Sequence, residues 1–349
     1  MNNEAEEAYN KKLDMLNKSL QKLGLGGIFT ETLDGLLDAT LEPALKGLKR
    51  VERIYPNDPY FIRAKSLCQK YKLPPQGFEN FQRLLCGIRN FPCILLINPK
   101  NDDYEFEEMV SKTTTLRWLE EALNNIGFEL DDIITMDLFP MLTDEWVDNH
   151  PHESRQAVQD MFGLTLDFIN EFKPNVILSC QCLNPSKKVR WKSFKHDMAD
   201  KLRSSMEGAE IQKVSEFPYK GHLTHVVHGF HPASMEYVRE RNPEKSEKLD
   251  TTLRTTFNSL FKPYADWMES YKTELLASHN TNIVMIRTVI KLLRLRVTDC
   301  DRIRGQEFAL GMSQGHDDLN LLDEWNDVKN ALDTILNKTS PNTSERLLS

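Results

Sequence analysis

The sequence predicts an α/β fold: a three-layer domain with a four- or five-stranded, mainly parallel sheet, and helical extensions at both ends. From residue 92 onward, short apolar runs alternate with amphipathic segments, which is typical of strand–helix–strand crossovers. Most strand candidates are continuous apolar runs, as expected for strands covered on both faces. The first 80 residues and those after about 245 show helical periodicity instead.

These patterns divide the 349 residues into four parts. Residues 1–80 form a helical N-terminal extension, 81–270 the α/β domain, 271–338 a helical C-terminal extension, and 339–349 a disordered tail. We expect the extensions to pack onto the α/β domain, because their apolar faces need a partner. The helices expected in the extensions cover 13–23, 33–51, 59–71, 283–297 and 319–336, with a linker at 72–77.

Within the α/β domain, each strand candidate is followed by a turn signal or by a helix with one apolar face. The helix after the first strand ends at Gly127, and the long one after the second strand ends before Pro174. The expected strands are Cys93–Ile97, Ile133–Phe139, Val176–Cys180, Ile211–Val214 and Leu223–Phe230. The expected helices are Thr115–Ile126, Glu153–Phe172, Phe194–Met206 and Lys245–Leu276.

The composition is that of an ordinary globular protein, with 40% hydrophobic and 28% charged residues and a net charge of −8. No apolar run is long enough to span a membrane, and the acidic N-terminus lacks the apolar core of a secretory signal. The six cysteines show no zinc or iron–sulfur spacing, which predicts a reduced, intracellular protein. No Walker loop or dinucleotide fingerprint is present, so we expect no cofactor.

Two strand-end turns carry the chemistry that we expect. One is Ile97-Asn98-Pro99, and the other is His231-Pro232-Ala233-Ser234, which follows the apolar run from Val226. Open α/β sheets bind their ligands at the carboxyl ends of their strands. If both strands belong to one parallel sheet, Asn98 and His231 can therefore face the same crevice.

The order of these pieces resembles the uracil-DNA glycosylase superfamily over roughly residues 85–265. Ile97-Asn98-Pro99 is similar to the Ile-Asn-Pro form of the family's first motif, and His231-Pro232-Ala233-Ser234 to its last, with Ala233 as an extra residue. The resemblance implies a DNA glycosylase that hydrolyses the N-glycosidic bond of a flipped base. Asn98 would orient the attacking water, and His231 would stabilise the leaving base.

The base-binding residues follow from the same resemblance. Asp137 lies where the family usually has an Asn that reads the base edge, and Ser234 belongs to the last motif. An ionised Asp137 would only accept hydrogen bonds, and would therefore suit an amino group rather than a carbonyl. Either Phe106 or Tyr104 would supply the ring that stacks on the base.

A basic stretch after the third strand could follow a nucleic-acid backbone, or could form a solvated helix face. The four charges closest to the strand end are Lys187, Lys188, Arg190 and Lys192. The histidines at 222, 225, 228 and 231 are spaced by three, so a strand would divide them between its two faces, and we expect no metal site there.

Two classes of function therefore remain open. One is the glycosidic hydrolase, which would have DNA or a nucleotide as its partner. The other is a catalytically silent relative that binds nucleic acid, a nucleotide or a protein through the same crevice. The helical extensions could also bind a protein partner.

Overall fold

The computed structural model describes residues 32–100, 104–181 and 194–309. The chain forms two compact units, Met1–Trp267 and Met268–Ser349. The predicted helices at 13–23 and 319–336 and the predicted tail at 339–349 lie outside the described residues.

The first unit is built on a five-stranded sheet in the order β2-β1-β3-β5-β4. β1 pairs in parallel with both β2 and β3, and β3 pairs in parallel with β5. β4 is antiparallel to β5 and closes one edge. The strands are β1 Cys93–Leu96, β2 Thr135–Asp137, β3 Val176–Ser179, β4 Val214–Tyr219 and β5 His222–His228. The predicted mainly parallel sheet is confirmed.

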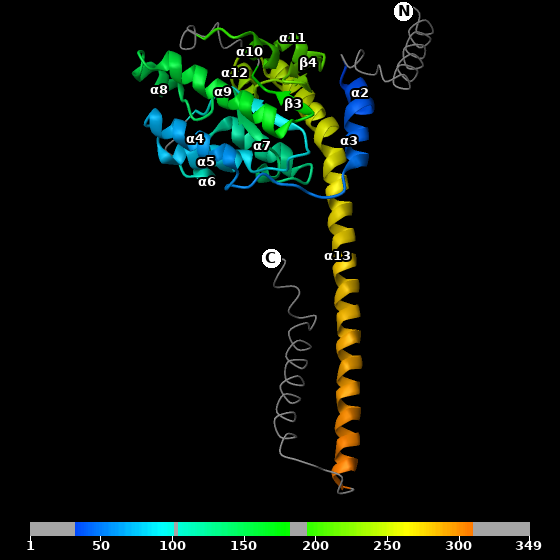
Figure 1. The fold of residues 1–349 in the computed structure, drawn as a ribbon. Helices are drawn as coiled ribbons and strands as arrows, with labels where there is room; N and C mark the ends of the chain where they lie inside the picture. The colour runs from blue at the N-terminus through cyan, green and yellow to red at the C-terminus, as the bar shows by residue number, and fades with distance from the viewer. Residues whose placement is uncertain (1–31, 101–103, 182–193, 310–349) are drawn as a thin grey trace, which may run out of the picture. The chain divides into compact units, whose positions relative to one another are not determined.

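Helices connect these strands and cover the sheet (Figure 1). α9 ends in a left-handed Lys173 just before Pro174, as the sequence predicts. The helices that follow β1 are α6 Phe106–Lys112, α7 Thr114–Asn124, the short 3₁₀ helix η3 Leu130–Asp132, α8 Asp144–Asn149, α9 Ser154–Phe172, α10 Asp197–Leu202, α11 Met206–Glu210, α12 Pro232–Arg239 and α13 Pro243–Ala309.

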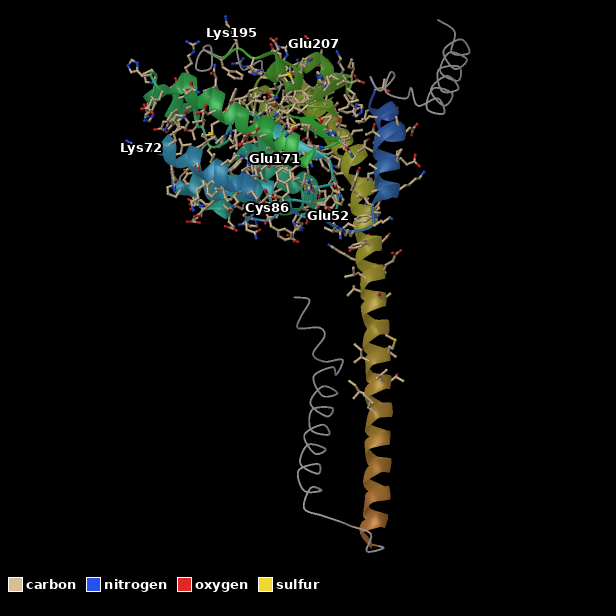
Figure 2. The ribbon with its side chains drawn as sticks, viewed as in Figure 1. Glu52, Lys72, Cys86, Glu171, Lys195 and Glu207 are labelled. Carbon is tan, nitrogen blue, oxygen red and sulfur yellow. The ribbon has the colours of Figure 1, made fainter. Side chains whose placement is uncertain are left out.

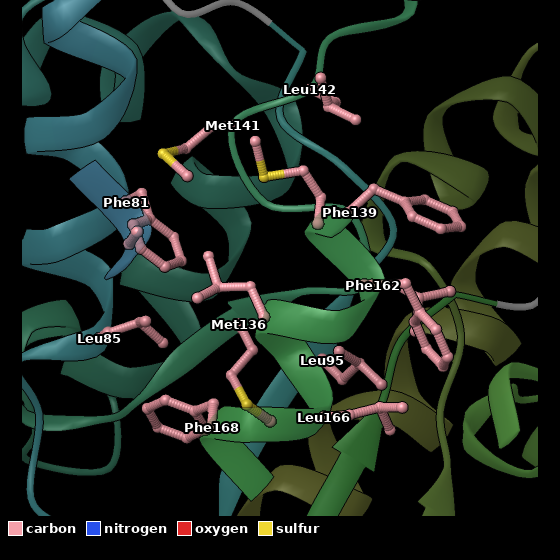
Figure 3. Close-up of a cluster of buried hydrophobic side chains, with 14 of the residues drawn as sticks. Phe81, Leu85, Leu95, Met136, Phe139, Met141, Leu142, Phe162, Leu166 and Phe168 are labelled. Atoms are coloured by element: carbon pink, nitrogen blue, oxygen red, sulfur yellow. The ribbon is translucent and has the colours of Figure 1, made fainter. Parts of the chain in front are cut away.

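One face of the sheet packs against α5 (Pro75–Leu85) and α9 in a cluster of buried apolar side chains (Figure 3). Leu95 and Met136 are register partners, so both point to this face. Phe81 comes from α5, and Phe162 and Phe168 come from α9. The opposite face carries Ile94, Leu178 and Val227, which are also buried. Helices on both faces complete the three-layer α/β architecture.

The N-terminal helices α4 (Pro59–Lys70) and α5 (Pro75–Leu85) belong to this same core. Tyr60 of α4 packs edge-on against Phe168 of α9 at 5.5 Å, and its hydroxyl donates to the carbonyl of Leu164. The expected linker at 72–77 is instead a tight turn that leads directly into α5. Before α4, the chain forms α2 Leu33–Leu36, a π-helical turn η2 Leu37–Leu41 and α3 Glu42–Gly47.

Several other sequence predictions of single elements were wrong. The helix expected over 33–51 is interrupted by η2 and ends at Gly47. The helix expected over Phe194–Met206 is divided into α10 and α11, because the Ser205 side chain accepts from Gly208 N and starts a new helix. The strand expected at Ile211–Val214 begins only at Val214. The two helices expected between 245 and 297 are one helix, α13, which continues through Pro263.

The surface of the α/β unit is rich in charge. Lys72, Lys195 and Glu207 are exposed at its periphery (Figure 2). Within the described ranges, none of the helices combines the length and apolarity that crossing a lipid bilayer requires.

Gly87 is fixed by a close approach of two backbones. A Cβ at this position would lie 2.6 Å from Ile134 N and 2.8 Å from the Ile133 carbonyl carbon. The neighbouring Ile88 N donates to the carbonyl of Asp132, which holds the α5–β1 connection against the segment that leads into β2. No flexible side chain can give way here.

Replacing Gly87 with Ala should therefore lower the free energy of unfolding by about 2 kcal/mol or more, measured by urea titration. Gly163 is the matched control, because a Cβ there meets nothing within 4 Å and the residue lies inside α9. Gly163→Ala should leave stability unchanged or raise it by up to about 1 kcal/mol. Equal effects of the two substitutions would contradict this account of Gly87.

Candidate functional site

The candidate site lies at the carboxyl edge of the parallel strands. The strand order reverses between β1 and β3, since β2 lies on one side of β1 and β3 on the other. In open α/β sheets, the ligand crevice forms at such a reversal, beyond the carboxyl ends of the strands. Asn98 follows β1 by two residues, and Asp137 ends β2.

The pairing register assigns these side chains to sheet faces. Asp137 is the partner of Leu96, so both point to the face that is opposite to Leu95. Asn98 comes two residues after Leu96. If side chains continue to alternate between the two faces of the sheet past the strand end, Asn98 lies on the same face as Asp137. Along β5, Val227 lies on this face as the partner of Leu178. His231 follows the end of β5 by three residues, as the N-cap of α12, and the pairing register does not extend to it.

Asn98 is half-buried and held by its amide group. Its Nδ2 lies 3.0 Å from the carbonyl of Pro99 and 3.4 Å from Oδ1 of Asp144. These contacts fix the orientation of the carboxamide and direct its hydrogen-bond donors to protein acceptors. The carbonyl oxygen Oδ1 remains the atom through which Asn98 can orient a water or a ligand donor.

Asp144 is a residue that sequence reasoning missed. It is the first residue of α8, and the Thr143 side chain caps this helix by accepting from Trp146 N. A threonine followed by two acidic residues is a recognisable helix-start signal. Its proximity to Asn98 depends on how α8 is placed relative to β1, which only the tertiary structure shows.

Asp137 carries a buried, unpaired carboxylate oxygen. The residue is partly accessible, yet its Oδ1 is buried and has no hydrogen-bond partner among the described residues. Removal from water raises the pKa of Asp137 from 3.8 to about 7. Burial therefore favours the protonated form of Asp137 over the ionised form that would only accept hydrogen bonds. In its protonated form, the carboxylic acid can donate a hydrogen bond.

Two further buried polar atoms at the end of β3 lack hydrogen-bond partners among the described residues. They are the Ser179 hydroxyl oxygen and Gln181 Oε1. Ser179 is the partner of Leu95, so its side chain points to the face opposite to Asp137. The amide Nε2 of Gln181 donates to the carbonyl of Leu202 at 2.9 Å. Nearly all buried polar groups in proteins are paired, so this edge of the sheet is incompletely satisfied at three points.

His231 is the N-cap residue of α12 and is half-buried. Its carbonyl accepts from the Ser234 amide at 2.8 Å, so Ser234 takes part in the first helical turn. The partial positive charge of a helix N-terminus favours an anion beside His231. The residues on either side of His231 line two separate cavities. Phe230 lines one of about 310 Å³, and Pro232 one of about 300 Å³. Neither of these cavities includes Asn98 or Asp137.

The other predicted site residues are less favourably placed. Phe106 is buried, and the Arg83 guanidinium lies 3.8 Å from its ring centroid, so this ring is not presented to a ligand. The Tyr104 ring is half-buried, with Lys112 Nζ at 4.5 Å. The four predicted phosphate-binding residues, Lys187, Lys188, Arg190 and Lys192, lie outside the described residues.

His228 belongs to a structural cluster rather than to this site. Its Nδ1 accepts from Ser205 N at 3.3 Å, and its Nε2 lies 3.2 Å from the Ser215 hydroxyl. Burial, with smaller contributions from Lys213 and Arg203, lowers the pKa of His228 to about 4. The imidazole is therefore neutral at pH 7. Within the described part of the chain, no three metal-binding side chains are grouped as a metal ion would need.

Neither a protein-family model nor a curated protein matches this chain. The functional argument accordingly depends on the residues at the sheet edge.

Replacing Asp137 with Asn tests the buried carboxyl directly. A raised pKa stabilises the folded state below pH 3.8, and this contribution is lost as the pH rises through 7. At pH 8 the wild type buries an unpaired charge, which the variant lacks. Asp137→Asn should thus raise the free energy of unfolding at pH 8 by about 2–4 kcal/mol, a gain that shrinks toward pH 4.

Denaturant titrations of both proteins at pH 4, 6 and 8 measure this difference. Asp167→Asn is a control for the loss of one carboxylate on a neighbouring helix. Its effect should not follow the same pH dependence. A gain from Asp137→Asn that does not change between pH 4 and 8 would contradict a pKa near 7.

Proposed function

We propose that the carboxyl edge of the sheet binds a flipped nucleobase and hydrolyses its N-glycosidic bond, as a DNA glycosylase does. The observation that carries this proposal is Asp137, a buried and unpaired carboxyl with a pKa of about 7. The register of β1 and β2 assigns it to the sheet face of Asn98. The resemblance of the two strand-end turns to uracil-DNA glycosylases supports the same function.

Asp137 is suited to the polar edge of a base. A carboxylic acid presents one donor and one acceptor side by side, which matches the neighbouring C=O and N–H groups of a pyrimidine or purine ring. In its protonated form, Asp137 can donate to a base carbonyl. Binding of such an edge would also satisfy the buried Oδ1, so the ligand would remove the penalty that the free protein carries.

Three residues have roles in the bond cleavage. Breaking the bond between the sugar C1′ and the base nitrogen leaves the electron pair on the base. The His231 imidazole, at the N-terminus of α12, stabilises this anion by donating a hydrogen bond. Asn98 Oδ1 orients the water that bonds to C1′, and the adjacent Asp144 carboxylate can accept the proton that the water loses.

The partner in this proposal is DNA or a nucleotide. Lys187, Lys188, Arg190 and Lys192, in the segment after β3, would contact the phosphate backbone. The alternative is a silent relative that binds nucleic acid, a nucleotide or a protein through the same crevice without hydrolysis. One observation favours it, namely that neither cavity beside His231 includes Asn98 or Asp137.

Replacing His231 with Leu should lower turnover by about a hundredfold or more, the scale seen when one anion-stabilising donor is lost. Asn98→Ala should lower kcat similarly, with substrate binding largely retained. The assay measures base release from single-stranded and mismatched oligonucleotides that contain uracil or other altered bases. His222→Leu is the matched control, because His222 begins β5 at the opposite edge of the sheet, and it should leave turnover unchanged.

The wild type's own activity decides between the two functions. If it releases no base but a nucleoside raises its melting temperature, and Asp137→Asn alters that shift, the silent relative is the correct function. If it neither releases a base nor responds to nucleosides, hydrolysis and nucleoside binding both fail at this site, and only the protein-binding form of the alternative is left.

The pH dependence of base release tests Asp137 separately. If the protonated carboxyl donates to the base, kcat/KM of the wild type should fall as the pH rises through about 7. Asp137→Asn keeps a donor at every pH, so its activity should decline less between pH 6 and 8. A wild-type rate that rises over this range would instead indicate that the ionised form is the active one.

A further inference from the structure

The distal part of α13, in the second compact unit, presents many apolar side chains to solvent. Side chains project from this part of the helix in Figure 2. The large apolar side chains that are exposed here are Leu275, Leu276, Val284, Met285, Ile286, Val289 and Leu293. Helices of globular proteins gain most of their stability by packing an apolar face, so this one requires a partner.

The apolar residues follow a seven-residue repeat. Leu276, Ile283, Ile290 and Val297 recur at intervals of seven, and Ile286, Leu293 and Cys300 lie three residues after members of this series. Alternating steps of three and four are the pattern of a coiled-coil seam. The distal part of α13 is thus built to pack along one other helix.

Ile290 differs in exposure from its neighbours on the helix. It is 6% exposed, whereas Val289 and Leu293 are both 49% exposed. Among residues 271–293 whose side chains are described, Ile290 alone is buried. Ile286 and Leu293, which belong to the same repeat, are 48% and 49% exposed, so the described part of this row is largely without cover.

The chain contains a segment with the complementary repeat. Leu321, Trp325, Val328, Leu332 and Ile335 follow steps of four and three. In an antiparallel pair, the steps along one helix must match those read backward along the other. The two series of spacings do match. Read backward along α13, the spacings in residues are 3, 4 and 3, from Cys300 through Val297 and Leu293 to Ile290. Read forward along the second segment, they are also 3, 4 and 3, from Trp325 through Val328 and Leu332 to Ile335.

The charges of the two segments are opposite. Residues 283–304 contain six basic and two acidic residues, whereas residues 317–336 contain six acidic and one basic residue. Complementary charges beside a coiled-coil seam select the partner and the orientation. Two copies of the 283–304 segment would instead place like charges together, which disfavours a homodimer through this face.

The connection between the segments suits a reversal of the chain. α13 ends at Ala309, and the residues before Leu321 include Gly311 and Gly315. A connection this short gives the second segment an effective concentration in the millimolar range. The segment that follows α13 is therefore favoured over a separate molecule.

We propose that residues 321–335 fold back on the distal part of α13 and form an antiparallel two-helix coiled coil. Cys300, Val297, Leu293 and Ile290 would then meet Trp325, Val328, Leu332 and Ile335 in successive layers.

A disulfide tests the register. Trp325→Cys places a thiol opposite the native Cys300, and mild oxidation of the full chain should form an intrachain disulfide, mapped by mass spectrometry of proteolytic peptides. Asn326→Cys moves the thiol one position around the helix and should form at least about tenfold less of it. A disulfide that joins two chains would instead show that a second copy covers α13, and would overturn the proposal.

Hydrogen exchange tests the contact without a cysteine, since removal of Trp325 could itself weaken the pair. Leu332→Asp should speed amide exchange in residues 283–304 by about tenfold or more, because the helix loses its cover. Thr334→Asp adds the same charge on the outer side of the segment and should change exchange little. If neither substitution affects α13 and no intrachain disulfide forms, residues 321–335 do not cover it.

Discussion

The arrangement of the first unit depends on β1, which pairs in parallel with both β2 and β3. Its residues Cys93 to Leu96 are buried on both faces and hydrogen-bond to β2 and β3 in parallel. Because β2 and β3 lie on opposite sides of β1, the carboxyl ends of three strands meet at one edge. This pairing determines where Asn98, Asp137 and Ser179 lie, and it makes that edge the candidate site.

The same edge has a cost in stability that the core must offset. The sheet buries apolar side chains on both faces, yet at its end it also buries a carboxyl oxygen, a hydroxyl and an amide oxygen without partners among the described residues. Each such atom disfavours folding by about 1–3 kcal/mol. Functional sites commonly retain groups that lower stability, because a ligand uses the hydrogen bonds that the protein leaves unmade. The proposed base binding would give Asp137 such a partner.

The second unit follows a different physical rule. A sheet makes its backbone hydrogen bonds between neighbouring strands. The helix α13 makes its backbone hydrogen bonds within itself and lacks only a partner that packs on its row of apolar side chains. A coiled-coil partner needs matched spacing and opposite charge but no particular loop geometry. That is why the sequence pattern of residues 321–335 carries an argument about packing, although the same kind of pattern could not locate Asp144 beside Asn98.

The sequence by itself determined the fold class, the order of the strands along the chain and the two turns that contain Asn98 and His231. These features depend on local periodicity and turn chemistry, which can be recognised directly in the sequence. The tertiary structure alone decided that α10 and α11 are separate and that Phe106 lies beneath Arg83. It also decided that burial raises the pKa of Asp137 to about 7. A side chain's ionisation and accessibility depend on what surrounds it in space, and residues distant in the sequence supply those surroundings.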